Sequence, residues 1–146
     1  MPLSGPWRFS SRHASTRLTR DRITNCDYQV GDAYGLAEYV PRPVDFVFMA
    51  NSFHGVPDRE RLARIVGEAL KPGGRFAIVN WHQLPREKTT VLGQPRGPKS
   101  ELRLSPQQTV KAVEAGGLKC TAIVDIPPYH YGAIFEKPSV GKTVRS

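Results

Sequence analysis

The sequence lacks several features, and each absence excludes a class of protein. No two of its 13 glycines are separated by a single residue, which excludes the Gly-x-Gly-x-x-Gly turn of nicotinamide-dependent oxidoreductases. No apolar run approaches the roughly 20 residues that span a bilayer, and the first residues lack the apolar stretch of a secretory signal. Histidines and cysteines show no metal-ligand spacing. We therefore predict no membrane span and no metal site.

Cysteine is scarce. Cys26 and Cys120 are the only two, and 94 positions separate them. Such a pair has neither the density of a disulfide scaffold nor the spacing of a redox motif. We expect two free, buried thiols in a reducing compartment, and hence a cytoplasmic protein.

Acidic residues are scarce at the two ends of the chain. The net charge is +8, yet residues 1–24 hold five Arg against one Asp, and residues 137–146 hold three basic residues and no acid. The part between them is nearly neutral. A nucleic-acid surface would instead gather basic residues on a folded element. We therefore predict solvated basic ends and no nucleic-acid partner.

The segment from Val44 to Trp81 predicts a strand, a helix and a second strand. Phe46–Ala50 and Phe76–Val79 are apolar runs without alternation, which is typical of strands covered on both faces. Two buried strands joined by a helix form a parallel crossover, and ligands bind beyond the carboxyl ends of such strands. The loop Ala50–His54 is therefore the first candidate for a site. The helix between the strands is predicted by one apolar stripe: Leu62, Ile65, Val66, Ala69 and Leu70.

Further elements follow from shorter patterns. Asp27–Val30 predicts a short strand, and Leu70–Gly74 predicts a turn. Ser105, Pro106 and Gln108 have the spacing of a helix start, and that helix should stop at Gly116. Two final strands, Cys120–Ile126 and Tyr129–Glu136, are close enough in sequence to be antiparallel. The fold class is therefore α/β, an open and mostly parallel sheet with helices on both faces and an antiparallel C-terminal edge.

We expect three segments: a basic, disordered stretch at 1–24, an α/β domain at 25–138 and a basic flexible tail at 139–146. For residues 1–24, disorder, an organelle transit peptide and a mis-assigned start all stay open. Residues 82–104 are polar and rich in Gly and Pro, and a loop of this length is usually functional or mobile.

An ordered set of motifs carries a family resemblance. GDA at 31–33, DFVFMANSFH at 45–54 and LKPGGR at 70–75 occur in this order and at family-like separations. From about residue 27 to 138 the chain resembles the C-terminal two-thirds of a class I S-adenosylmethionine-dependent methyltransferase, most closely the small-molecule branch. The resemblance implies a truncated Rossmann-like methyltransferase fold and methyl transfer to a small-molecule acceptor.

The resemblance also implies cofactor-binding positions. Asp32 matches the acid that accepts from the adenine amino group, and Ala33 matches the residue whose amide reaches the ring. Ala50 and Asn51 match the strand end beneath the methionine part, and Phe53 matches the loop beside the cofactor. From the residues alone, Asp32 could equally cap a turn, and Asn51 could satisfy backbone groups at a strand end.

The same resemblance places His54, Trp81 and His82 on the side of the acceptor. A histidine near neutrality could serve as a base, although a methyl displacement needs one only if the acceptor loses a proton, and His54 could instead simply pack in its loop. We predict no catalytic residue.

The chain departs from the family pattern where a glycine-rich loop and a ribose-binding acid would precede Asp32. We therefore expect S-adenosyl-L-methionine binding to be weak or lost, and the alternative function is a non-catalytic interaction module. In the family a further strand lies beside the Val44–Met49 strand. Without it this apolar edge is unpaired and open to a homodimer.

Overall fold

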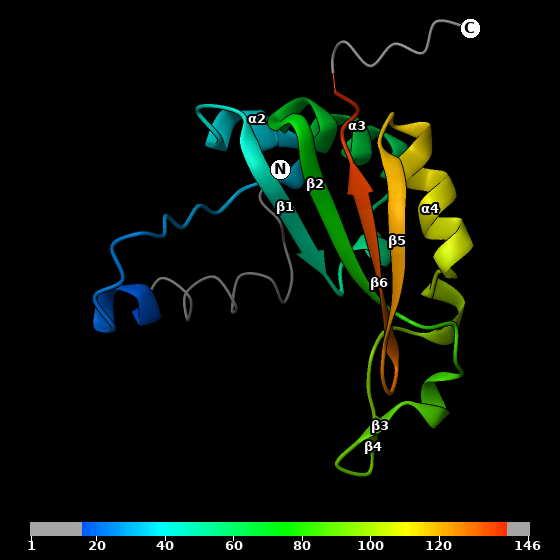
Figure 1. Ribbon diagram of the computed structural model, residues 1–146. Coiled ribbons are helices and arrows are strands. Elements are labelled where there is room, and N and C mark those ends of the chain that lie inside the picture. The colour runs from blue at the N-terminus through cyan, green and yellow to red at the C-terminus, as the bar shows by residue number, and fades with distance from the viewer. Residues whose placement is uncertain (1–15, 140–146) are drawn as a thin grey trace, which may run out of the picture.

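The computed structural model describes residues 16–139, and its centre is a four-stranded sheet (Figure 1). In spatial order the strands are β1 (Val44–Ala50), β2 (Leu70–Trp81), β6 (His130–Glu136) and β5 (Lys119–Ile126). β1 and β2 are parallel, while β6 is antiparallel to both β2 and β5. The predicted parallel crossover and the antiparallel final pair are confirmed. The antiparallel strand β6 lies between β2 and β5, so the edge strand on this side is β5.

The larger helices are α2 (Leu36–Tyr39), α3 (Arg59–Ala69) and α4 (Pro106–Ala115). α3 and α4 begin at side-chain caps, whereas α2 begins at Gly35 without one. The Asp58 carboxylate accepts a hydrogen bond from the amide of Arg61 at 3.0 Å and so caps α3. α4 begins with the predicted capping box, in which Ser105 and Gln108 bond reciprocally. Short 3-10 turns connect the larger elements: η1 (Ala33–Gly35), η2 (Phe53–Gly55), η3 (Arg86–Lys88) and η4 (Ser100–Leu102).

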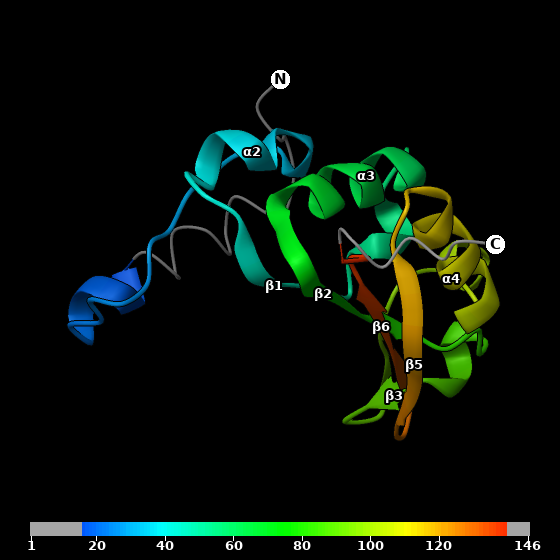
Figure 2. The ribbon, with the colours of Figure 1, turned by 45° about the horizontal axis from the view of Figure 1, so that its top comes forward.

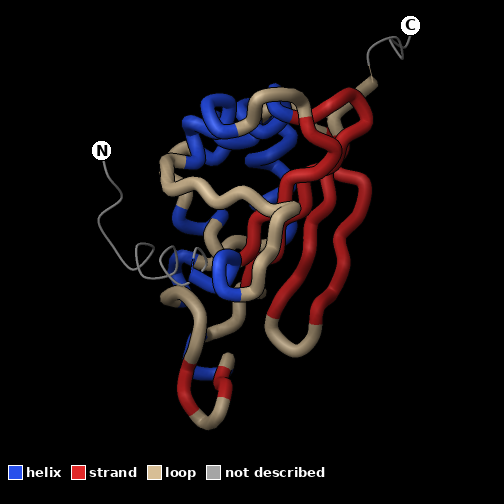
Figure 3. The backbone as a smooth tube through the Cα atoms, turned by 90° about the vertical axis from the view of Figure 1, so that its left-hand side faces the viewer, coloured by secondary structure: helices blue, strands red, loops and turns tan. Residues whose placement is uncertain are grey.

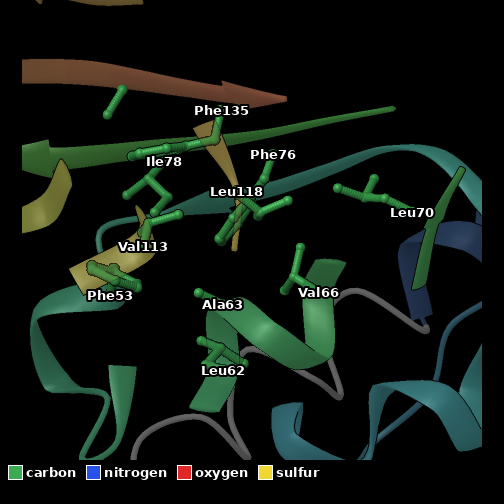
Figure 4. Packing of buried hydrophobic residues seen from close by; sticks show 11 residues of the cluster. Phe53, Leu62, Ala63, Val66, Leu70, Phe76, Ile78, Val113, Leu118 and Phe135 are labelled. Carbon is green, nitrogen blue, oxygen red and sulfur yellow. The ribbon is translucent and has the colours of Figure 1, made fainter. Parts of the chain in front are cut away.

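The hydrophobic core lies between the sheet and the helices α3 and α4 (Figure 4). Phe76 and Phe135 are both fully buried, with ring centroids 6.3 Å apart. They come from neighbouring strands and meet the apolar stripe of α3 that the sequence predicts. The buried cluster comprises Phe53, Leu62, Ala63, Val66, Leu70, Phe76, Ile78, Val113, Leu118, Ala133 and Phe135.

Only one face of the sheet is covered by the described helices. α2, α3 and α4 lie on the same side of it (Figure 2). On the other side, Phe46 and Phe48 keep 53% and 60% of their surface exposed. The prediction of a β1 strand covered on both faces is therefore wrong, and the expected second helical layer is not present within residues 16–139. An apolar run in the sequence does not show whether the second face of the strand packs against a helix or faces solvent.

The prediction of a strand at Asp27–Val30 is wrong. These residues are exposed and make no strand pairing. A strand needs a partner to bond its backbone groups, and no described strand lies beside this segment. Within the segment expected to be disordered, residues 16–20 are helical, and residues 1–15 and 140–146 of the two terminal segments lie outside the described residues.

The predicted turn at Leu70–Gly74 is absorbed into the start of β2. Gly73 has a φ of +78°, which a residue with a side chain would rarely adopt. The amide of Gly73 donates to the carbonyl of Lys137, and the amide of Lys137 donates to the carbonyl of Gly74. The chain thus bends at the glycine yet stays bonded to the segment after β6.

The polar stretch 82–104 is ordered by a small hairpin and two 3-10 turns. β3 (Thr90–Val91) pairs with β4 (Gln94–Pro95), and the hairpin stands apart from the main sheet (Figure 3). It extends beyond the carboxyl ends of β1 and β2 (Figure 1). The sequence did not predict this hairpin.

The two cysteines are free, as predicted, but Cys26 is exposed rather than buried. Cys120, on β5, is half-buried, and burial raises the pKa of its thiol. Within residues 16–139, every helix is too short or too polar to cross a bilayer.

Candidate cofactor and acceptor site

The carboxyl ends of β1 and β2 lie side by side. Ala50 pairs with Val79, and the amide of Asn51 donates to the Val79 carbonyl at 2.8 Å. Asn51 has a φ of +58°, so the chain leaves β1 through a left-handed turn. Asparagine tolerates that conformation better than most residues with a side chain. This turn places Ala50 and Asn51 at the edge where a parallel sheet binds its ligands.

Asp32 and Ala33 are tied to the start of α3 through Tyr34. The Tyr34 hydroxyl accepts a hydrogen bond from the amide of Asp58 at 2.9 Å, and Arg61 lies 4.5 Å above its ring. η1 is thereby held against the first turn of α3, which follows β1 after the η2 turn. One oxygen of the exposed Asp32 carboxylate accepts from the amide of Tyr34 at 2.8 Å, so the capping role is real. The other oxygen makes no hydrogen bond with a described residue.

Phe53 and His54 form η2 between β1 and α3. Phe53 is fully buried in the core, so its side chain holds the turn in place. His54 is half-buried, and its carbonyl accepts from the Arg59 guanidinium at 2.6 Å. Burial first, and then the positive charges of Arg59 and Arg103, lower the pKa of His54. We call Asp32, Ala33, Ala50, Asn51 and Phe53 the β1 group.

A second cluster surrounds the end of β2. The Trp81 ring lies 4.2 Å from the His130 ring and stacks on Tyr129 at 6.1 Å, measured between centroids. His82 Nε2 is 2.8 Å from the carboxylate of Asp125 on β5. The sequence placed Trp81 and His82 here, and the structure adds the residues that hold them. We call Trp81, His82, Arg103, Tyr129 and His130 the β2 group.

Arg103 belongs to this group although the sequence did not indicate it. Its guanidinium lies 5.2 Å from the Trp81 ring, and the residue is only 2% exposed. It donates to the Thr89 hydroxyl at 2.9 Å and to the carbonyls of Pro98 and Arg96 at 3.1 Å. No described carboxylate bonds it. Burial, followed by the charge of Arg86, lowers the pKa of Arg103. The guanidinium thus ties the 82–104 loop to the end of β2.

A buried polar network underlies the β2 group. Tyr131 is fully buried, and its hydroxyl donates to the Leu104 carbonyl at 2.9 Å and lies 2.7 Å from the Thr109 hydroxyl. The Asn80 amide donates to both hydroxyls at 3.3 Å. The network joins β2, β6 and α4 to the end of the loop. Sequence reasoning missed it, although Asn80 is a lone polar residue in an apolar run.

His130 is packed differently from His82. Its Nε2 atom is buried and has no hydrogen-bond partner among the described residues. Burial, and then the nearby His82 and Arg103, lower the pKa of His130. The imidazole is therefore a neutral part of the aromatic cluster.

Comparison with known proteins agrees with this geometry. A family model described as a methyltransferase domain matches residues 9–78. The structure is similar to an S-adenosylmethionine-dependent methyltransferase from Aquifex aeolicus, with 20% identity and a TM-score of 0.71 over 87% of this chain and 63% of that one. The structure is also similar to a putative type 11 methyltransferase from Sulfolobus solfataricus, with 19% identity and a TM-score of 0.63 over 88% of this chain and 68% of that one. No curated protein matches the sequence.

A third similar structure is human N-acetylserotonin methyltransferase in complex with S-adenosylmethionine, with 16% identity and a TM-score of 0.53 over 77% of this chain and 34% of that one. The fold is that of the S-adenosylmethionine-dependent methyltransferases, and the resemblance read from the sequence is confirmed. This chain spans 63% of the length of its Aquifex relative.

Proposed function

We propose that the β1 group holds the adenosine and methionine parts of S-adenosyl-L-methionine, and that a small-molecule methyl acceptor binds beside the β2 group. The observation that carries the proposal is the meeting of the two strand ends at Asn51 and Val79. The unbonded carboxylate oxygen of Asp32 is available to an amino group, and the exposed backbone of Ala33 can approach a flat ring. These residues fit the nucleoside half of the cofactor.

When bound, S-adenosyl-L-methionine supplies an electrophilic methyl group. The residues of this chain position the acceptor and manage its proton. His54 has a lowered pKa, so its imidazole is neutral near pH 7 and can accept the proton of a hydroxyl or amine acceptor. Trp81 is half-buried among Tyr129, His130 and Arg103, and its exposed part can contact an apolar acceptor. The 82–104 loop limits the size of that acceptor. Alignment of the two reactants then provides much of the acceleration.

We expect the affinity for the cofactor to be weak. The β1 group supplies one carboxylate and backbone atoms, and the sequence has no glycine-rich loop of the kind that admits close backbone approach to a nucleotide. The free thiols of Cys26 and Cys120 support a cytoplasmic location as part of the same proposal.

Titration of the full chain with S-adenosyl-L-methionine, followed by amide NMR shifts, tests the proposal. We expect shifts at Asp32, Ala33 and Asn51, with a dissociation constant well above the micromolar range. Asp32→Ser keeps a good cap but shortens the acceptor, so it should remove the shifts. Asp27→Ser, at an exposed acid in the same segment, is the matched control. Shifts that are absent at millimolar cofactor, or unchanged in Asp32→Ser, contradict the proposal.

A further inference from the structure

The outer edge of β1 is unpaired among the described residues. β1 is the first strand of the sheet order and bonds only to β2. Because the Asn51 amide points to β2, alternation along the strand directs the backbone groups of Met49 and Val47 to β2 as well. The N–H and C=O groups of Phe46 and Phe48 therefore point outward.

We propose that the occupant of this edge is a second copy of the chain, whose β1 pairs antiparallel about a two-fold axis at Val47. An isologous contact of this kind closes at two subunits. It joins the two sheets into one continuous sheet of eight strands. This inference does not depend on cofactor binding.

The sequence of β1 is self-complementary in this register. Val47 is the central residue of Val44–Ala50, so the register that pairs the whole strand puts Phe46 opposite Phe48 of the second copy. Both residues direct their backbone groups outward, which makes them hydrogen-bonded pairs, while Val47 faces its own copy as a close, non-bonded pair. The rings already stack at 6.5 Å within one chain. Cross-strand pairing then brings four rings together on the open face.

Charge also favours this register. Asp45 is the only charged residue of β1, and it is paired with Lys71 at 3.1 Å. The antiparallel register places the two Asp45 residues roughly 13 Å apart at about 3.4 Å per residue, whereas an in-register parallel pairing would place them face to face. The other edge, β5, carries Lys119, Asp125 and a bulge, which are features that protect an edge from pairing.

The buried area predicts a weak dimer. A phenylalanine side chain buries about 150–250 Å² when it is fully covered, and Phe46 and Phe48 are each about half exposed. Four such rings contribute on the order of 400 Å², and the paired backbones add to this. The total stays below about 1,200 Å², the lower end of specific interfaces. We therefore expect a dissociation constant in the micromolar range.

Cysteine cross-linking tests the register. Val47→Cys should form an intermolecular disulfide under mild oxidation, because opposite Cβ atoms in such a pair are about 4.5–5.5 Å apart. Ala50→Cys is the matched control, since its two copies would be roughly 20 Å apart and cross-linking should stay at the level of the unsubstituted chain. Equal cross-linking of both variants overturns the register. A disulfide within one chain, from position 47 to Cys26, would identify the chain's own N-terminal part as the occupant and overturn the proposal.

Sedimentation velocity at 1–200 µM tests the association itself. The unsubstituted chain should show a concentration-dependent monomer–dimer equilibrium. Phe48→Lys, at an exposed position that leaves the core intact, should raise the dissociation constant at least tenfold. Val124→Lys changes an apolar residue on β5 that is 45% exposed, and it should leave the dissociation constant unchanged. A chain that is monomeric at every concentration overturns the proposal and leaves a different polypeptide as the occupant.

Discussion

The β1 group and the β2 group differ sharply in how the protein supports them. Arg103 and Tyr131, at and beneath the β2 group, are 2% and 0% exposed and lie in dense hydrogen-bond networks. In the β1 group, Asp32 and Asn51 are exposed, and each makes few bonds. The β2 group is therefore fixed by the chain itself, whereas the β1 group has room for contacts that a ligand or a second polypeptide would supply.

His54 connects the two groups. It belongs to the turn that follows β1, yet the charge of Arg103 from the β2 group contributes to its lowered pKa. A change at Arg103 is therefore expected to alter the pKa of His54. The contrast between the two groups leads to four predictions.

Arg103→Ala should have the largest effect. The substitution leaves the Thr89 hydroxyl and the Pro98 carbonyl without this donor, while the Arg96 carbonyl keeps its bond from the Thr89 hydroxyl. Buried unpaired groups cost about 1–3 kcal/mol each. Because the loop can partly relax, we expect a loss of about 2–4 kcal/mol in the free energy of unfolding, measured with urea. Arg86→Ala, an exposed loop arginine that bonds the carbonyls of Gly97 and Pro95, should cost less than about 1 kcal/mol. Equal losses would show that burial does not distinguish these arginines.

Tyr131→Phe should rank second. It removes one hydroxyl that bonds Thr109, Asn80 and the Leu104 carbonyl, and we expect a loss of about 1–3 kcal/mol. The control is Tyr129→Phe, whose exposed hydroxyl donates only to the Thr90 carbonyl, with an expected loss near 0.5 kcal/mol. Thermal unfolding of both variants checks the order. If Tyr129→Phe loses as much stability as Tyr131→Phe, the buried network does not stabilise the fold more than an exposed hydrogen bond does.

Asn51 tests the β1 group. Its φ of +58° disfavours a side chain such as alanine, so Asn51→Ala should cost about 1 kcal/mol. Asn51→Gly should be close to neutral because glycine adopts this conformation freely. Urea unfolding of the pair separates backbone strain from any side-chain bond. If both variants lose equal stability, the loss comes from the asparagine side chain and not from the backbone conformation of the turn.

Local patterns explain which parts of the fold the sequence predicted. The caps of α3 and α4 and the two central strands depend on residues within a few positions of each other. The Asp27–Val30 strand failed because a strand exists only with a partner, and its partner is not among the described strands. The open face of β1 could not be predicted either, since its two faces have equally apolar sequences.

The site shows the same limit. The position of Trp81 and His82 was predictable because a recognisable strand ends there. Arg103 and Tyr131 were not, because their roles come from contacts across long separations, such as that between Asn80 and Tyr131, 51 positions apart. The lone Asn80 in an apolar run was the one local indication of that network.

Acidification should give the smallest effect, and it involves His54 between the two groups and His130 in the β2 group. The pKa values of His54 and His130 are lowered in the folded chain, mainly by burial. The unfolded chain therefore binds more protons than the folded chain at pH values below about 6.5, the ordinary pKa of histidine, and stability must fall as the pH drops through that range. Urea midpoints at pH 7.5 and 5.5 measure the fall. His130→Phe should reduce the difference between the two midpoints, because it removes an imidazole that the unfolded chain protonates more readily than the folded chain, where its Nε2 is buried and unpartnered. Adding His54→Phe in a double variant should reduce the difference further. A double variant with the full difference would place the pH dependence in other groups.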